Sequence, residues 1–346
     1  MEYKKIIELT TVVTGGTPST EKREYWDNGS IPWLQSGCCQ NCEVNSAGKY
    51  ITQEGYDNSS TRMMPADTVM IALTGATAGK VGYLNFAACG NQSITGILPC
   101  GALNQRYLFY YLISQRHKIL ADCVGGAQAH ISQGYVKNIK VPVLSLVEQE
   151  QVVEVLTQLN NIISMRRKEI GLLDTLVKSR FAEMFGDVKY GTERWGEKPF
   201  KDITINLDSK RKPVKEADRK KMQGIYPYYG ATGIVDYVND YRQDGDFLLI
   251  SEDGKALELR SKPIAFLASG KIWVNNHAHV QQCTDECNMI YLMYHINFMD
   301  VSIWVTGIDQ KKLNRANLDT IPIALPPIEL QEQFADFVNQ VTKSKF

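Results

Sequence analysis

The sequence predicts an α+β fold: two similar domains of irregular mixed sheet plus helices, a long coiled-coil-type helix between them, and a short second helix at the C-terminus. Three observations predict this arrangement. They are a long-period internal repeat, short strand-like runs punctuated by glycine and proline in both copies, and a sustained helical pattern between the copies. An internal repeat is interpreted before local motifs because it fixes the architecture. With 346 residues, the chain is long enough for two domains that each bury a core.

The repeat is clearest where each copy runs into a helix start. Residues 139–143 (IKVPV) lead into 145–151 (SLVEQEQ), and 182 residues later 321–325 (IPIAL) lead into 327–333 (PIELQEQ). Segments further upstream align at offsets of 184 and 179, and such small drifts are what loop insertions produce. Two copies suggest a molecule that does one job at two places.

The composition indicates an ordinary globular protein. Its 38 basic and 38 acidic side chains cancel, which argues against a protein that coats polyanions in general. No stretch approaches the roughly 18 apolar residues of a membrane span, and the N-terminus lacks the apolar core of a secretion signal. We therefore expect a cytoplasmic protein whose eight cysteines are reduced.

The first domain is expected over residues 1–144. Its strands are short, since the run 68–73 ends at a Thr-Gly pair and a second run, 80–84, follows closely. Segment 107–113 is too apolar and aromatic to be exposed, and it predicts a buried helix that ends near Ser114.

A long spacer helix is predicted over residues 145–186. Ser145 can cap its start, and Glu148 follows three residues later, which is the spacing of a capping box. Apolar residues then recur at helical intervals as far as Phe181. Such a helix is about 60 Å long and needs a partner along its apolar face. The expected seam contains Leu156, Leu159, Ile163, Ile170, Leu173 and Val177.

The second domain is expected over residues 187–326, and like the first it is predicted to contain short strands that end at turns. Residues 247–251 and 263–267 are predicted to be buried strands. A second helix is predicted to start in 327–346, with an apolar stripe of Phe334, Phe337 and Val341. Only about five turns fit there at 3.6 residues per turn, so we interpret this segment as the start of a truncated distal helix.

The layout and its motifs resemble the specificity subunit of type I restriction-modification systems, over nearly the whole chain. No single motif is specific, whereas the ordered set, occurring twice, is. The matching stretches are 15–19 (GGTPS), 31–34 (IPWL), 125–128 (GGAQ), 226–233 (YPYYGATG), 245–251 (GDFLLIS), 307–310 (GIDQ), both helix starts, and 173–181 with 184–187.

This resemblance implies a prokaryotic, cytoplasmic, non-catalytic reader of DNA. Each domain would be a target-recognition domain for one half of a bipartite sequence. The helices would act as a ruler, because a rigid spacer between two groove-reading modules sets the half-site spacing. The resemblance further implies that the helices pack antiparallel and dock DNA methyltransferase subunits, with the motor-nuclease (restriction) subunit joining that complex.

The short C-terminal helix departs from the family pattern. It leaves part of the spacer seam without its usual partner. This puts a full complex from the chain alone in question, and two explanations stay open: the chain is a truncated allele, or it forms a homodimer through the exposed seam.

Candidate DNA contacts lie in turns and in cationic segments. Residues 74–82 (TGATAGKVG) predict a glycine-rich tip at a strand end, which allows close backbone approach to DNA. The amides at 91–92 and 275–276 suit adenine edges, and they suit equally well the role of satisfying loop backbone. From Lys198 to Lys221, nine Lys/Arg stand against four Asp/Glu, which indicates either a solvated loop or a phosphate-facing one.

The candidate DNA-binding residues are Gly75, Thr77, Lys80, Asn91, Gln92, Gln128, His130, Lys137, Lys210, Arg211, Lys212, Tyr229, Thr232, Asn275, Asn276, His277, Gln310, Lys311, Lys312 and Arg315. Tyr229 belongs to an aromatic cluster of a kind that more often packs in a core than stacks on bases.

Nucleotide binding is disfavoured by the details of residues 74–82. Three residues rather than four separate Gly75 from Gly79, and Val81 stands where a phosphate loop needs Ser or Thr for Mg²⁺. Zinc is also disfavoured, because the cysteine and histidine clusters near Cys38 and His277 lack a doubled C-x2-C spacing.

Two other functions remain as alternatives. Asp246, Asp253 and Lys255 imitate the acids and lysine of a stand-alone metal-dependent nuclease. A two-domain scaffold without a DNA role is the other, and it predicts no salt-dependent binding to duplex. No catalytic residue, metal or cofactor is assigned under the leading interpretation.

Overall fold

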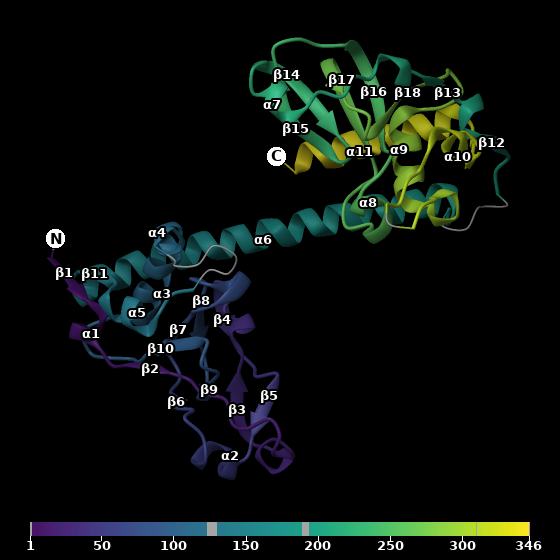
Figure 1. Ribbon diagram of the computed structural model, residues 1–346. Coiled ribbons are helices and arrows are strands. Elements are labelled where there is room, and N and C mark those ends of the chain that lie inside the picture. Colours follow the sequence, from purple (N-terminus) through teal and green to yellow (C-terminus); the bar gives the residue numbers. More distant parts are fainter. Residues whose placement is uncertain (1, 123–129, 189–193, 309, 346) are drawn as a thin grey trace. The chain divides into compact units, whose positions relative to one another are not determined.

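The computed structural model describes residues 2–122, 130–188, 194–308 and 310–345. The chain forms two compact units, unit 1 (Met1–Met165) and unit 2 (Arg166–Phe346), and helix α6 (Leu146–Phe185) contributes to both (Figure 1). Each unit combines sheets with helices, so the predicted α+β class is confirmed. Within the described ranges, no helix is both long enough and apolar enough to cross a membrane.

Unit 1 contains two sheets and a separate strand pair. One sheet has the order β2 (Val12–Thr14), β10 (Ile94–Ile97), β7 (Val69–Ala72), β8 (Val81–Leu84) and β4 (Cys42–Val44). The other has the order β5 (Lys49–Ile51), β3 (Ile31–Leu34), β9 (Ala88–Gly90) and β6 (Met63–Met64). The pair is β1 (Glu2–Lys5) with β11 (Lys140–Val143). The helices and turns are α1 (Ile6–Leu9), α2 (Gln53–Asp57), α3 (Gln105–Ser114), α4 (Arg116–Ala121), α5 (Gln133–Asn138), η1 (Arg23–Tyr25), η2 (Ser36–Cys38) and η3 (Gly75–Thr77).

Helix α3 is the buried helix that the sequence predicts in the first domain. It begins after Asn104, whose side-chain oxygen accepts the Arg106 N–H (2.9 Å) and the Tyr107 N–H (3.2 Å). Leu108 and Leu112 are fully buried in a core shared with β7 and β8. Both strands are buried along their whole length, which explains their continuous rather than alternating apolar sequence.

Unit 2 is built on one six-stranded sheet. Its order is β13 (Thr204–Asn206), β18 (Ala278–Cys283), β16 (Gln243–Ser251), β17 (Ala265–Val274), β14 (Gln223–Gly230) and β15 (Gly233–Val238). The pair β12 (Glu197–Pro199) with β19 (Pro322–Ala324) lies apart from it. The helices and turns are α7 (Glu216–Arg219), α8 (Lys255–Leu259), α9 (Met289–Phe298), α10 (Arg315–Asp319), α11 (Ile328–Ser344), η4 (Phe200–Asp202), η5 (Asp208–Lys210) and η6 (Ser302–Trp304).

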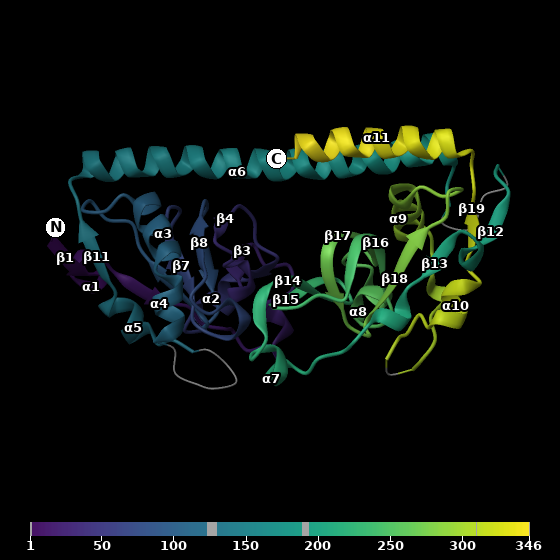
Figure 2. The same ribbon diagram turned by 90° about the horizontal axis from the view of Figure 1, so that it is seen from above.

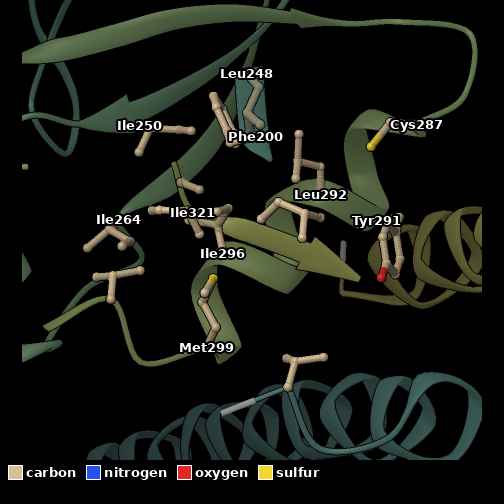
Figure 3. Close-up of a cluster of buried hydrophobic side chains, with 14 of the residues drawn as sticks. Phe200, Leu248, Ile250, Ile264, Cys287, Tyr291, Leu292, Ile296, Met299 and Ile321 are labelled. Carbon is tan, nitrogen blue, oxygen red and sulfur yellow. The ribbon is translucent and has the colours of Figure 1, made fainter. Parts of the chain in front are cut away.

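The core of unit 2 joins the sheet, α9, α11 and the C-terminal turns of α6. Figure 3 shows Tyr291, Leu292 and Ile296 of α9 together with Leu248 of the sheet. Phe181 of α6 stacks on the Tyr291 ring, with 5.7 Å between centroids and 15° between planes. The end of the long helix is therefore part of this core.

Helix α6 begins as predicted, with a capping box. The Ser145 Oγ accepts the Glu148 N–H (3.3 Å), and the Glu148 carboxylate accepts the Ser145 N–H (2.9 Å). These two bonds satisfy helix-start donors that otherwise lack partners.

The short helix α11 runs antiparallel to the C-terminal part of α6 (Figure 2). Near its start, Phe334 meets Phe181 edge-on at 5.3 Å. At its end, the Lys345 ammonium pairs with Asp174 at 2.5 Å. As α11 advances from Phe334 to Lys345, its contacts on α6 move back from Phe181 to Asp174. The two helices therefore run in opposite directions, and α11 ends opposite Asp174.

Candidate nucleic-acid interface

Four segments of unit 1 meet at one end of its sheets, joined by backbone hydrogen bonds. The loop after β7 is tied to the loop after β9, because Leu73 N–H donates to Ser93 O (2.8 Å). It is tied to the segment before α5, because Ile131 N–H donates to Leu73 O (2.9 Å). The segment after β2 joins them, with Gly16 N–H donating to Gly90 O (2.8 Å). We call residues 15–17, 74–80, 91–93 and 130 the loop face of unit 1.

Unit 2 repeats these bonds at matching positions. Glu252 N–H donates to His277 O (2.9 Å), and Leu313 N–H donates to Glu252 O (2.8 Å). Lys212 N–H donates to Val274 O (3.1 Å), in the place of the Gly16 bond. We call residues 210–212, 231–232, 252–255, 275–277 and 312 the loop face of unit 2. The internal repeat of the sequence is therefore also a repeat of this loop arrangement.

The two loop faces differ in charge. In unit 1 the segment after β2 is Gly-Gly-Thr, whereas in unit 2 the corresponding segment is Lys210-Arg211-Lys212. The Arg211 guanidinium pairs with Glu252 at 2.6 Å, and the Lys312 ammonium pairs with the same carboxylate at 2.8 Å. Lys210 and Lys212 are exposed beside this pair. Three of the nine cations counted from Lys198 to Lys221 in the sequence, residues 210–212, thus lie on the loop face of unit 2.

A mostly buried ionic network supports that face from beneath. His279 is 1% exposed, and its Nδ1 lies 2.7 Å from Asp208 while its Nε2 lies 2.9 Å from Leu313 O. Burial alone would raise the pKa of Asp208, but the hydrogen bonds from His279 and Val280 N–H outweigh it and hold this pKa below its ordinary value. Burial is likewise outweighed at Glu252, where the bonds from Lys312 and Arg211 lower the pKa. Both carboxylates are therefore charged at neutral pH and hold the cations in place.

The paired amides take the same local role in both units. The Asn91 side-chain oxygen accepts the Ser93 N–H (3.2 Å), and the Asn275 side-chain oxygen accepts the His277 N–H (2.8 Å). Gln92 is exposed, and its side-chain oxygen accepts the Thr17 hydroxyl (2.6 Å). Each oxygen thus stabilises its loop, as the second of the two interpretations expects. Base contact through the amide nitrogens stays a prediction.

The glycine-rich segment forms a tight turn between two strands. Gly75 and Gly79 both have φ of +71°, a conformation that favours glycine. The turn η3 leads into β8 and not into a helix, so it lacks the context of a phosphate loop. Lys80 donates to the Gln40 side chain at 2.6 Å, and the Thr77 hydroxyl donates to Thr74 O at 3.4 Å.

The remaining candidates are distributed more widely. Lys137 lies in the last turn of α5, and Arg315 lies at the start of α10, where it pairs with Asp319. Tyr229 is 9% exposed and its ring lies near that of Phe266. The structure therefore shows this tyrosine packed in the core rather than available for base stacking. The candidates Thr232, Asn276, His277 and Gln310 are exposed, Lys311 is half-buried, and Gln128 lies outside the described residues.

The geometry contradicts the nuclease alternative. Asp246 lies within β16, whereas Asp253 lies beyond its end. Five residues of extended strand separate Asp246 from the strand end, which is about 17 Å at 3.3 Å per residue. Two such carboxylates cannot share a metal ion. Asp253 instead holds the His277 ring, at 2.8 Å.

The zinc interpretation receives no support from the described part of the chain. There, no three His, Cys, Asp or Glu side chains gather as metal ligands. His277 and His279 are each occupied by an aspartate, Asp253 and Asp208 respectively.

The predicted helix seam is covered over only part of its length. Val177 is 2% exposed, and Leu173 packs against the core of unit 2. Phe334, Phe337 and Val341 of α11 belong to the same core or pack against it. Leu156 is half-buried, whereas Leu159, Ile163 and Ile170 are 49%, 47% and 40% exposed.

Sequence reasoning missed two groups of residues. Asp208, Glu252 and His279 form the ionic network, and only their tertiary proximity reveals it. Gln149 and Gln331 are fully buried at the two helix starts. The repeat had marked their motif, but it could not show which residue of the motif is buried.

A duplicated sheet domain with a loop face on each copy, joined through a long helix, defines a two-site recognition protein rather than a single-pocket enzyme. The family model described as "Type I restriction modification DNA specificity domain" matches residues 1–172 and 192–346. The chain belongs to this family, as the resemblance in the sequence predicts, and family members of this kind are specificity subunits rather than catalytic ones.

Individual relatives agree with this assignment. A type I restriction enzyme specificity subunit of Escherichia coli is 31% identical over 167 residues, 47% of this chain and 41% of that protein. The chain thus spans less than half the length of this relative. The MjaIX specificity subunit of Methanocaldococcus jannaschii is 22% identical over 375 residues, 97% of this chain and 85% of that protein. The crystal structure of the type I S subunit from M. genitalium shares the fold, with a TM-score of 0.57 at 16% identity over 99% of this chain and 90% of that one.

Proposed function

We propose that the chain is the sequence-specific DNA-recognition subunit of a type I restriction-modification complex. Residues 1–144 and 187–326 act as target-recognition domains, each reading one half of a bipartite site. The long helix over 145–186 and the distal helix from 327 set the gap. The observation that carries this proposal is the loop face, which is closed by matching backbone bonds in both units.

On the loop faces, the cations are assigned to phosphate contact and the amides to base contact. Exposed Lys210 and Lys212, with Lys311 nearby, suit phosphate oxygens, which supply affinity independent of sequence. The side-chain oxygens of Asn91, Gln92 and Asn275 are engaged in the loops, which leaves the nitrogens of these amides to donate to base edges. Exposed Asn276 is the fourth amide proposed for base contact. Unit 1 has fewer cations in the corresponding segment, so its contribution to affinity is expected to be less sensitive to salt.

The partners follow from the helices. The exposed apolar residues Leu159, Ile163 and Ile170 on α6 form a surface that suits DNA methyltransferase subunits, with the restriction subunit joining through that complex. α11 ends opposite Asp174, so it does not cover these residues. A homodimer through this seam is the alternative partner arrangement. The compartment is the prokaryotic cytoplasm.

Co-expression with the neighbouring methyltransferase subunit, followed by genome-wide mapping of methylated bases, tests the proposal. A single bipartite motif with a fixed gap is expected. Asn91→Ala should then change base preference in one half only, and Asn275→Ala in the other half only. Asn160→Ala, on an exposed position of α6, is the matched control and should change neither. Methylation without a bipartite motif, or changes in both halves from one substitution, would contradict the two-domain assignment.

A further inference from the structure

Each helix start is held to its domain by one buried glutamine. In unit 1, Gln149 lies in the first turns of α6 and is 0% exposed. Its side-chain oxygen accepts the Asn104 N–H at 2.8 Å. Its side-chain nitrogen donates to Leu144 O at 2.9 Å and to Ala102 O at 3.3 Å. One side chain therefore joins the strand-to-helix connection to the segment that precedes α3.

Unit 2 contains the same arrangement at the start of α11. Gln331 is 0% exposed, accepts the Asn288 N–H at 2.8 Å, and donates to Pro326 O at 2.8 Å and Glu286 O at 3.2 Å. The two glutamines are 182 residues apart, and their partners are 182 or 184 residues apart. We call Gln149 and Gln331, with these bonds, the glutamine clamps.

Further bonds make each clamp stiff. The side chains of Asn104 and Asn288 cap α3 and α9. The residues whose N–H groups bind the two glutamines are therefore held in place by their own helices. The Tyr107 hydroxyl donates to Pro142 O at 3.1 Å, and the Tyr291 hydroxyl donates to Ala324 O at 2.7 Å. A buried polar network whose members are satisfied holds one geometry, because any rotation leaves donors or acceptors unpaired.

At the joint of unit 1, apolar packing alone would leave more freedom. In unit 1, Val152 and Val153 of α6 are only partly buried against the domain core, and the Tyr110 hydroxyl lies 3.2 Å from that of Thr157. The contacts of Val152 and Val153 are dispersion contacts, which have no preferred direction, and the two hydroxyls form a single hydrogen bond. The planar Gln149 amide makes three directional hydrogen bonds. Among these groups, Gln149 makes the largest number of directional bonds between the helix and the domain.

We propose that Gln149 and Gln331 are positioning residues that set the rotational phase of each recognition domain on its helix, and thereby the gap between half-sites that the protein accepts. This inference rests on the proposed function. One added base pair moves a half-site by about 3.4 Å and turns it by about 35° around the duplex. To reject such a site, the protein must hold each domain on its helix within a smaller range of rotation and shift than one base pair produces. The glutamine clamps supply this constraint.

The test uses the full chain in its complex with methyltransferase subunits and compares duplexes whose half-sites are separated by the native gap or by one base pair more or fewer. The measured quantity is the ratio of methylation rates at native and altered gaps. Gln149→Met keeps the volume and removes all three bonds, and it is expected to lower this ratio by about tenfold. Base preference within each half-site should stay unchanged, which separates phase from a general loss of structure. Gln331→Met is expected to act in the same direction.

Exposed glutamines two residues further along supply the controls. Gln151→Met and Gln333→Met alter the same residue type on the same helix turns, and they should leave the ratio unchanged. If Gln149→Met does not fold, Gln149→Asn, which retains the amide on a shorter stem, is measured in its place. A folded, assembled clamp variant whose gap ratio stays within twofold of the wild-type value would overturn the inference. A wild-type protein that recognises no bipartite site would instead overturn the proposed function.

Discussion

The buried His295 of α9 makes the stability of unit 2 sensitive to mild acid. This side chain is 2% exposed, and burial lowers its pKa to about 3. Its Nε2 accepts the Ala324 N–H at 3.3 Å, so a proton added to Nε2 would abolish this hydrogen bond and place two N–H groups against each other. The folded state therefore keeps the ring neutral.

The sign of the pH effect follows from the two pKa values. The unfolded chain titrates this histidine near its ordinary value of 6.5, and the folded chain only near 3. Between these values the unfolded state binds the extra proton, so stability is full above pH 6.5 and is lost as the pH falls. From pH 7.5 to 5.5, linkage gives a loss of about 1.4 kcal/mol for this one group.

The assay is hydrogen exchange of the α9 peptide, combined with urea unfolding at pH 7.5 and pH 5.5. His295→Gln retains an acceptor without a titrating group, so its unfolding free energy should fall by about 1.4 kcal/mol less than that of the wild type over this interval. Equal pH dependence in both proteins would refute the reasoning, because it would mean that the buried ring is protonated without cost.

Three further outcomes are expected from substitutions elsewhere. Phe181→Ala should destabilise unit 2 by about 3–5 kcal/mol in urea unfolding, since it removes a fully buried ring, whereas exposed Leu176→Ala should cost far less. Glu252→Gln should flatten the loss of stability at acid pH, because the lowered pKa of Glu252 gives stability that is present above its ordinary pKa of 4.5 and is lost as pH falls through the folded value; equal acid profiles would contradict this. Lys212→Ala should reduce the slope of log affinity against log salt by about one in duplex binding, with Lys178→Ala on α6 as the control.

Local signals predicted the helices well. The capping box of Ser145, the periodicity up to Phe181 and the apolar run of α3 all depend on residues close in sequence, and each is confirmed. The strand predicted at 263–267 begins at Ala265 and continues to Val274, because pairing with β16 extends it beyond its apolar part.

Long-range features could not be predicted in the same way. The loop faces depend on which strands are neighbours, and the ionic network around His279 joins residues that are 27 to 71 positions away in sequence. Which glutamine of the repeated helix-start motif would be buried depends on the packing of Asn104 against the helix. The repeat located the helix-start motif in both copies, whereas the hydrogen bonds of its buried glutamines are visible only in the folded chain.

The loop faces are closed by main-chain bonds, and this has a consequence for how targets can change. Leu73, Ile131, Glu252 and Leu313 hold their loops through peptide groups, which every substitution other than proline retains. Mutation of the outward side chains therefore leaves the frame of each domain intact. Under the proposed function, a lineage carrying this scaffold is expected to exchange one half of its target at a time, without altering the other half.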